Sequence, residues 1–276
     1  MAKGLEISDD DSSMTGKRFS EEVKDVLAAL DDLMARANAI AMLRAKDGRK
    51  LGVKATEALR AVQEDLSDAW TEIDQFIEQV GTEGALEQET IKEYAAQYFQ
   101  HVSSFPRYLS AIHSNCDDIK VRQLLLENLV DEDKGEENHP ELWMRFAEGM
   151  GNTREEVKNK ITMRETRDLV ETFMRLSKSE KYHIGLAALY CYESMQPEIS
   201  ETKKEGLQKF YNIEDENTLK FFTVHMHADK YHRAIVRKMI IELSNSKEKQ
   251  AEILKAVKSS LGVLNNFLTG MERAYC

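Results

Sequence analysis

The segment HMHADKYH, from His225 to His232, contains the sharpest grouping of residues that could do chemistry. On an α-helix, where successive residues are about 100° apart, His225, Asp229 and His232 fall within about 60° of arc, whereas His227 points nearly the opposite way. Two imidazoles and a carboxylate on one stripe can reach one metal ion without bending the backbone. The stripe predicts ligands of a first-row metal; the alternative is a polar helix face that contains histidines.

Two further segments place carboxylates where a metal would use them. Glu193 occurs in the middle of GLAALYCYESMQPEI, an apolar segment in which an ionised carboxylate must be paired or coordinated if it is buried. The alternative is that it lies on an exposed face or pairs with a lysine or arginine. In LLLENLVDEDKGEENHPELW, Glu132 and His139 are two turns apart on one face if the helix continues past Gly135. The alternative there is a solvated acidic turn.

Together the three segments supply carboxylates and imidazoles but no thiolate. Such a set on facing helices is the ligand inventory of a dinuclear non-haem site in a helical bundle. Oxygen and nitrogen ligands favour iron or manganese over a structural zinc. The predicted metal ligands are Glu132, His139, Glu193, His225, Asp229 and His232.

Long helices are expected to hold these side chains. The chain of 276 residues has only 3 prolines and 13 glycines, so helix breakers are rare and an all-β fold is excluded. Apolar residues at intervals of three and four predict an all-α main body of about seven helices, with Pro140 opening a short one. The other predicted helices cover residues 87–101, 121–131, 165–176, 184–195, 201–211, 217–243 and 251–274.

The first 80 residues are predicted to stand apart from this body. Residues 1–17 are acidic and aperiodic, which is typical of a disordered tail. Residues 18–80 contain two amphipathic runs separated by the polar stretch KDGRKLG, which predicts a helical hairpin. The sequence GTEG at 81–84 marks the boundary, so the predicted metal-binding domain is 81–276.

Composition excludes several classes of function. The formal net charge of −11 argues against a nucleic-acid groove and an anionic membrane surface. No run of 18 apolar residues occurs, and the first residues lack the apolar stretch of a secretory signal. The three scattered cysteines indicate reduced thiols. We therefore expect a cytoplasmic protein that binds neither nucleic acid nor membrane.

Four long segments resemble the haem-oxygenase-like di-iron oxidases and oxygenases, seven-helix bundles related in fold to thiaminase II and pyrroloquinoline-quinone synthase C. Within that superfamily the likeness is to the para-aminobenzoate synthase-like proteins typified by the Chlamydia protein associating with death domains. It extends from about residue 86 to the C-terminus. The segments are AAQYFQHVSSFPRYLSAIHSNCDD, LLLENLVDEDKGEENHPELW, GLAALYCYESMQPEISETKKEGL and FFTVHMHADKYH. The resemblance implies that all six predicted ligands occupy the metal-binding positions of the family. It also implies that these residues bind two Fe(II) ions or an iron–manganese pair.

The resemblance also implies roles outside the ligand set. Lys203 falls on a lysine that the family is thought to use as nitrogen source or site partner, and Tyr192 matches a tyrosine near the metals. The alternatives are a solvated lysine and a packing tyrosine. One departure concerns the tyrosine thought to be consumed as aromatic precursor, because its position is Glu78 here. This departure favours an external small molecule over a consumed side chain.

The resulting prediction is a di-iron oxidase or oxygenase that uses dioxygen as co-substrate and resembles the para-aminobenzoate synthases of folate biosynthesis. Its expected partners are a small-molecule substrate and an electron donor, and a homodimer is compatible with the sequence. One alternative is a di-iron oxidase of an external amino acid or fatty acid. The other is a non-catalytic helical interaction protein, for which the predicted N-terminal hairpin would provide the docking surface.

Overall fold

The computed structural model describes residues 86–194, 196–243 and 246–276, without the side chains of 198, 227–235, 237–238 and 241–242. The predicted tail (1–17), the predicted hairpin (18–80), the domain boundary and Glu78 lie outside the described residues and stay predictions. The side chains of Asp229 and His232 also lie outside the description.

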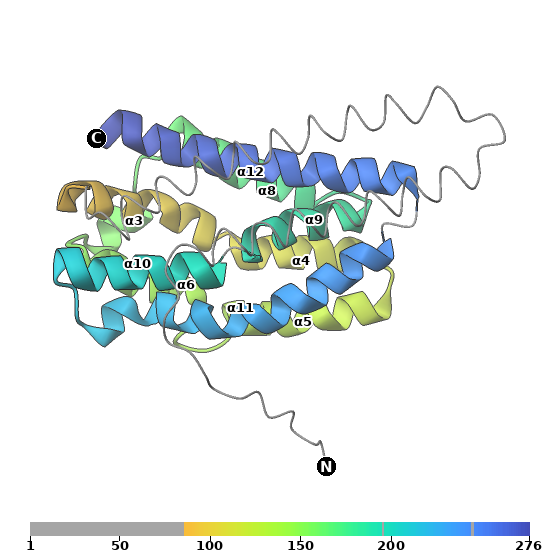
Figure 1. Cartoon of the computed structure of the whole chain (residues 1–276), viewed down its shortest axis with the longest axis horizontal. Helices are drawn as coiled ribbons and strands as arrows, with labels where there is room; N and C mark the ends of the chain where they lie inside the picture. The colour runs from red at the N-terminus through yellow and green to blue at the C-terminus, as the bar shows by residue number, and fades with distance from the viewer. Residues whose placement is uncertain (1–85, 195, 244–245) are drawn as a thin grey trace, which may run out of the picture. The chain divides into compact units, whose positions relative to one another are not determined.

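All secondary structure in the described part of the chain is helical, which confirms the predicted all-α class (Figure 1). In chain order the helices are α3 (Gln88–Val102), α4 (Phe105–Asn115), α5 (Ile119–Asp133), α6 (His139–Gly149), α7 (Arg154–Lys158), α8 (Arg164–Ser177), α9 (Tyr182–Glu193), α10 (Gln196–Tyr211), α11 (Glu216–Leu243) and α12 (Lys247–Tyr275). No helix within these ranges is long and apolar enough to cross a membrane.

The helix ends follow local signals in the sequence. Proline occupies the first turn of α4 and of α6, where its missing N–H needs no partner. Pro197 likewise lies in the first turn of α10, which is why that helix begins at Gln196 and not near the predicted residue 201. Helix α7 was not predicted, because five residues are too few for a periodic pattern. Its sequence signal is the capping box between Thr153 and Glu156.

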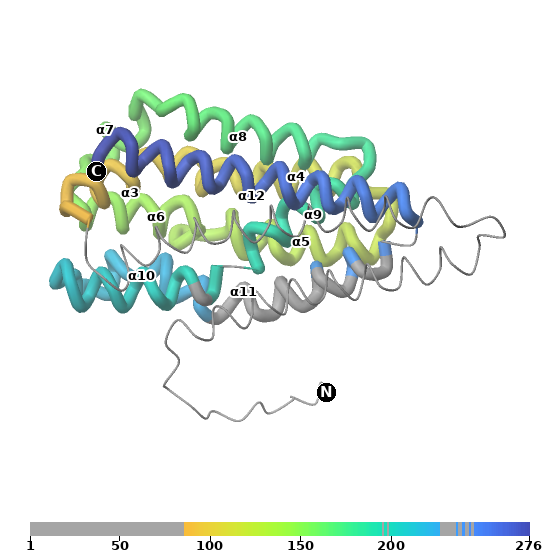
Figure 2. Tube along the Cα trace, turned by 45° about the horizontal axis from the view of Figure 1, so that its top comes forward, coloured from red at the N-terminus to blue at the C-terminus, as the bar shows by residue number. Residues whose placement is uncertain are grey.

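The helices form three layers (Figures 1 and 2). Helices α8 and α12 pack on one side of the layer that contains α3, α4, α6 and α9, and the pair α10 and α11 packs on the other side. Trp143 lies at the centre of the core and donates a hydrogen bond of 2.8 Å from its indole nitrogen to the carbonyl oxygen of Ala95. The middle layer thus supplies α6 and α9, which carry two of the predicted ligands.

Helix α9 lies very close to α4 at Gly185. A Cβ atom at this position would come within 2.5 Å of Ile112 Cγ1 and 3.2 Å of the Ser177 backbone. Only glycine therefore allows this approach of α9 to its neighbours. The contact fixes the helix whose last residue is Glu193.

Candidate metal centre

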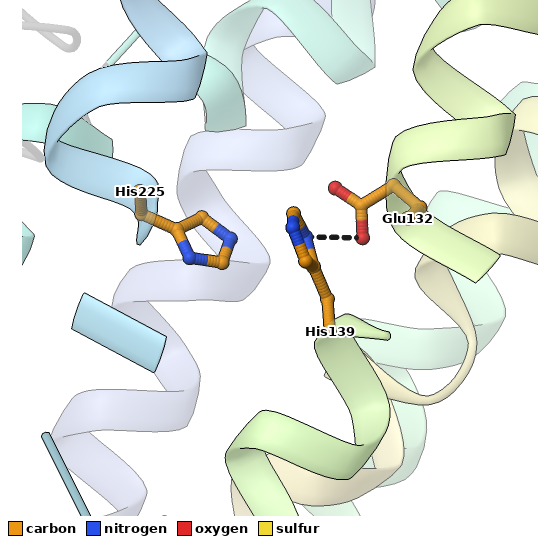
Figure 3. Close-up of side chains that lie close together, drawn as sticks. All are labelled: Glu132, His139 and His225. Carbon is orange, nitrogen blue, oxygen red and sulfur yellow. Dashed lines mark ion pairs between the residues drawn. The ribbon is translucent and has the colours of Figure 1, made fainter. Parts of the chain in front are cut away.

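Three of the predicted ligands converge in the structure. Glu132 at the end of α5, His139 at the start of α6 and His225 in the middle of α11 each present a ligand atom within 4.8 Å of the others (Figure 3). All three side chains are buried. Buried charged and imidazole groups need compensating partners, and three such groups converging from three helices could hold one metal ion.

Glu132 and His139 meet across a turn and not along one helix. The prediction of a continuous helix past Gly135 was wrong, because α5 ends at Asp133 and Gly135 has a φ of +86°. Asn138 then starts α6: its side-chain oxygen accepts from the Glu141 N–H at 3.0 Å, and its amide donates to the Gly135 carbonyl at 3.0 Å. The turn thus brings His139 back toward the end of α5.

The contact between these two residues has the spacing of neighbouring metal ligands. His139 Nδ1 lies 2.8 Å from Glu132 Oε2 (Figure 3), yet the nitrogen has no aligned hydrogen-bond partner. Two ligand atoms at about 2.1 Å from one metal and at right angles lie about 3.0 Å apart. Burial lowers the pKa of His139, but the carboxylates of Glu132, Asp131 and Glu193 together raise it by more, so the net pKa is raised.

His225 is held in one tautomer by its own helix. Its Nδ1 donates a hydrogen bond of 2.7 Å to the carbonyl oxygen of Phe221, one turn earlier in α11. The lone pair is therefore on Nε2, the nitrogen available for coordination, as in many metal-binding histidines. Burial, with a contribution from His139, lowers the pKa of His225 to about 3, so the imidazole is neutral. The two imidazole rings lie with their centroids 4.4 Å apart.

Glu193 is buried, with 3% of its surface exposed, which contradicts the surface alternative. Its Oε1 accepts a hydrogen bond of 2.6 Å from the Asn128 amide, and its Oε2 has no hydrogen-bond partner among the described residues. Burial raises the pKa of Glu193 to about 8, and the Glu132 charge adds to this effect, whereas Asn128 and His139 oppose it. The charges of Glu132 and His139 therefore act on Glu193. Its carboxylate oxygens are nevertheless not among the ligand atoms that all lie within 4.8 Å of one another.

Asn128 is a site residue that the sequence prediction missed. It precedes Glu132 by one turn and shares the buried face of α5. A polar residue on the buried face of a helix that also carries a candidate ligand was the available signal.

Asp229 and His232 cannot be placed relative to the cluster, because their side chains lie outside the description. The same holds for His227. Their segment is part of one continuous helix, α11, as the stripe prediction requires. The role of Asp229 and His232 stays a prediction.

Lys203 and Tyr192 are both buried. The Lys203 amine, on α10, donates a hydrogen bond of 2.7 Å to the Tyr94 hydroxyl, and burial lowers the pKa of Lys203 to about 7. This contradicts the alternative of an ordinary solvated lysine. The pKa of Tyr192 is raised, chiefly by burial and also by Tyr98, Tyr94 and the Glu132 charge. Tyr192 packs in the core against His101 and Phe105, as its packing alternative expects, and its role at the metals stays a prediction.

His101 lies in the core beside Tyr192 and is not part of the cluster of Glu132, His139 and His225. It is fully buried, and within the described part of the chain neither ring nitrogen has a hydrogen-bond partner. Its ring makes T-shaped contacts with Phe173 and Tyr192, both at 4.9 Å between centroids. Burial lowers its pKa to about 3, so it is neutral. Nothing in the spacing of the sequence distinguishes it from a hydrogen-bonded core histidine.

The helical fold and the buried cluster of Glu132, His139 and His225 are the features of a helical, metal-binding protein. The chain belongs to the family of iron-containing redox enzymes, whose family model matches residues 92–264. Over 204 residues it is 40% identical to 4-aminobenzoate synthase of Nitrosomonas europaea, which covers 71% of this chain and 83% of that protein. It is also 40% identical over 190 residues to 4-aminobenzoate synthase of Chlamydia trachomatis, with 68% and 82% covered.

Solved structures agree on the fold. A TenA homologue from Pseudomonas syringae superposes with a TM-score of 0.66 at 18% identity, covering 78% of this chain and 92% of that one. A protein from Shewanella denitrificans with a haem-oxygenase-like fold superposes with the same TM-score at 16% identity, with the same coverage. These likenesses confirm the predicted haem-oxygenase-like bundle.

The residues of the site fit iron. The described cluster offers one carboxylate and two imidazoles, all buried, and contains no thiolate. Glu193 adds a buried carboxylate oxygen to which no side chain or backbone group of the described residues donates a hydrogen bond. Iron in non-haem sites takes imidazole and carboxylate ligands of this kind.

Proposed function

We propose that this protein is a dinuclear iron oxidase or oxygenase that uses dioxygen to form an aminobenzoate-type product from a small molecule. The observation that carries the proposal is the convergence of Glu132, His139 and His225 from three helices. It is supported by the family and by the names of the relatives, 4-aminobenzoate synthases. We place the reaction in the cytoplasm and its product in folate synthesis.

The proposed ligands are the six predicted from the sequence. Glu132, His139 and His225 would bind first, because their ligand atoms already lie together. Glu193 would add a carboxylate through its unpartnered oxygen, while Asn128 holds the other oxygen. Asp229 and His232, one and two turns beyond His225, would complete the set.

The surrounding side chains prepare this site for redox chemistry. When bound, two ferrous ions supply electrons to dioxygen, and an external donor must restore them. Phe221 contributes its carbonyl oxygen to fix the His225 tautomer and its ring, 4.0 Å from the imidazole centroid, to cover it. The buried aromatic residues near His139 and His225 exclude water, which strengthens the electrostatic interactions within the site.

We also propose that the substrate is external and that Lys203 is a reusable partner of the site. Glu78 has no ring to supply as aromatic precursor. Among the described tyrosines, Tyr94 is buried against Trp143, with ring centroids 5.8 Å apart, and it holds Lys203 through its hydroxyl. Tyr94 thus has a structural role that its consumption would remove.

The test is metal uptake coupled to oxygen consumption. Metal-free protein should bind close to two Fe(II) per chain and then consume oxygen when a reductant is added. His225→Ala should lose both properties, whereas His113→Ala, a half-buried histidine on α4 outside the cluster, should keep them. Iron content by elemental analysis and oxygen uptake by electrode decide the matter. A wild-type protein that takes up no iron would refute the proposal.

A further inference from the structure

Helix α5 has an exposed apolar face. Six large apolar side chains are exposed in the part of the chain that the structure describes, and three of them belong to this helix. They are Ile119, Leu126 and Val130, with 60%, 49% and 40% of their surface exposed. At about 100° per residue these three side chains fall within about 40° of arc. They form one apolar stripe along α5, which we call the α5 stripe.

The α5 stripe lies opposite the face that packs in the bundle. The buried residues of this helix are Val121, Leu125, Asn128 and Glu132. Their mean direction is about 150° from that of the stripe. Within the described helices, α5 packs mainly against α4 and α6, beside α4 in Figure 1. A helix with apolar residues on opposite faces is typical of one that packs between two neighbours. The described bundle supplies neighbours on one side only.

Charged residues border the stripe in a definite order. Lys120 and Arg122 lie in the first half of α5, and Glu127 and Asp133 lie in its second half. By helical geometry, Arg122 and Asp133 fall on one side of the stripe, and Lys120 and Glu127 fall on the other side. Each side therefore has a basic residue toward the start of the helix and an acidic residue toward its end.

This order matches that of a second copy of the same helix turned end to end. In an antiparallel pair related by a two-fold axis, each side of the stripe faces the same side of the second copy. With the axis between Leu125 and Leu126, Leu126 packs beside its own counterpart. Ile119 then lies within one helical turn of Val130 of the second copy. The three exposed apolar side chains thus cover one another.

The same register brings opposite charges together. Lys120 comes within about one helical turn of Glu127 of the second copy, and Arg122 comes equally near Asp133 of the second copy. The two-fold axis repeats both pairs, so four pairs of opposite charge surround the apolar contact. In a parallel pair, by contrast, residues of like charge would lie at the same level.

We propose that the α5 stripe is the contact surface of a homodimer, in which two copies of this chain pair their α5 helices antiparallel about a two-fold axis. The inference goes beyond the proposed function, since the contact requires neither metal nor substrate. A single pair of short helices buries less than the roughly 800 Å² per partner of a standard interface. The dissociation constant of the dimer should therefore be micromolar.

The test is the mass of the full-length protein in solution. Sedimentation at about 1 to 100 μM should give a mass that rises toward twice that of one chain. Leu126→Glu places two carboxylates together at the axis and should raise the dissociation constant at least about 100-fold. Ile161→Glu, at a side chain that is 89% exposed and outside the stripe, is the matched control and should leave the mass unchanged. Circular dichroism checks that both variants keep the helical fold.

A charge swap tests the antiparallel order. Lys120→Glu alone and Glu127→Lys alone should each weaken the dimer about tenfold, because like charges then face each other on both sides of the axis. The double variant restores opposite charges, so its dissociation constant should return to within about threefold of the wild-type value. A double variant that is as weak as the single variants would overturn the antiparallel pairing.

Two results would overturn the second copy as the occupant of the stripe. One is a wild-type dimer that Leu126→Glu leaves intact, since the contact would then lie elsewhere. The other is a wild-type protein that stays monomeric at the highest concentration. If the melting temperature of such a monomer falls in Leu126→Glu but not in Ile161→Glu, the stripe is covered by a segment of the same chain, such as residues 18–80.

Discussion

Asn128 on α5 donates a hydrogen bond of 2.6 Å to Glu193 on α9, so the helix that carries Glu132 also orients a second candidate ligand. The two carboxylates are therefore not independent. Any movement of α5 displaces Glu132 and the partner of Glu193 together, which couples the two halves of the proposed site.

Asn128→Ala should weaken iron binding about 10- to 100-fold, the usual effect of removing an outer partner of a metal ligand. Removing the donor also leaves Glu193 Oε1 buried without a partner, so the metal-free protein should lose about 1–3 kcal/mol of stability at neutral pH. Iron titration and urea unfolding measure the two effects. Asn115→Ala, which removes an exposed side-chain hydrogen bond on α4, is the matched control and should change neither value appreciably.

Glu193 should make the stability of the metal-free protein fall as the pH rises. Its pKa is about 8 in the folded protein, against an ordinary value of 4.5. Between these pH values the folded protein binds more protons than the unfolded chain, so the free energy of unfolding decreases from pH about 4.5 to about 8. Urea unfolding at several pH values measures the slope. Glu193→Gln should flatten it and raise the apo stability at pH 8, and an unchanged slope in this variant would show that another group is responsible.

Iron binding should offset the loss of stability that the buried Glu193 carboxylate causes in the metal-free protein. At a free iron concentration of about 100 times the dissociation constant, binding adds about 2.7 kcal/mol to the free energy of unfolding. The melting temperature of the wild-type protein should therefore rise with iron, while that of Glu193→Gln should rise much less. Calorimetry or dye-monitored melting with and without Fe(II) provides the comparison.

The helical stripe in α11 predicts different roles for two neighbouring histidines. His232→Ala should remove one of two bound iron ions and weaken the other, because His232 shares the face of His225. His227→Ala should leave the iron content unchanged, because it faces the opposite side of the helix. Elemental analysis of both purified variants tests this. Equal loss of iron from both would mean that the stripe is not the ligand face.

Iron-loaded protein given only oxygen and a reductant should make little or no aminobenzoate. The position at which a consumed tyrosine is expected is Glu78, so multiple turnovers should require an added small molecule. Product analysis together with intact-protein and peptide mass spectrometry decides this. A stoichiometric aromatic product with a matching loss at one tyrosine or at Lys203 would contradict the external-substrate proposal.

The sequence predicted the helices well and the contacts between them only in part. Three- and four-residue spacing predicted most of the helices, and prolines such as Pro140 marked helix starts, because both signals are local. The meeting of Glu132 and His139 depends on the left-handed backbone of Gly135, and glycine also occurs inside helices, so the turn could not be distinguished from continuation. The burial of Lys203 did have a signal, since Ile199 and Leu207 lie one turn before and after it on the same face.

The partner of Glu193 and the surroundings of His101 depend on packing between distant segments. Asn128 and Glu193 are 65 residues apart, and no local pattern specifies which helices will face each other. His101 is surrounded by rings from three other helices, among them Phe173 and Tyr192. Contacts between residues that are distant in the sequence cannot be predicted from the spacing of apolar residues along each helix.

The close approach at Gly185 limits how the proposed centre can change shape during a reaction. At Gly185 the backbone of α9 packs so closely against Ile112 and the end of α8 that an added Cβ atom would clash with Ile112. We therefore expect Glu193, the last residue of that helix, to follow a change in metal coordination by rotating about its own side-chain bonds. On this expectation the Glu193 carboxylate changes its orientation while the backbone that carries it keeps its place beside α4 and α8.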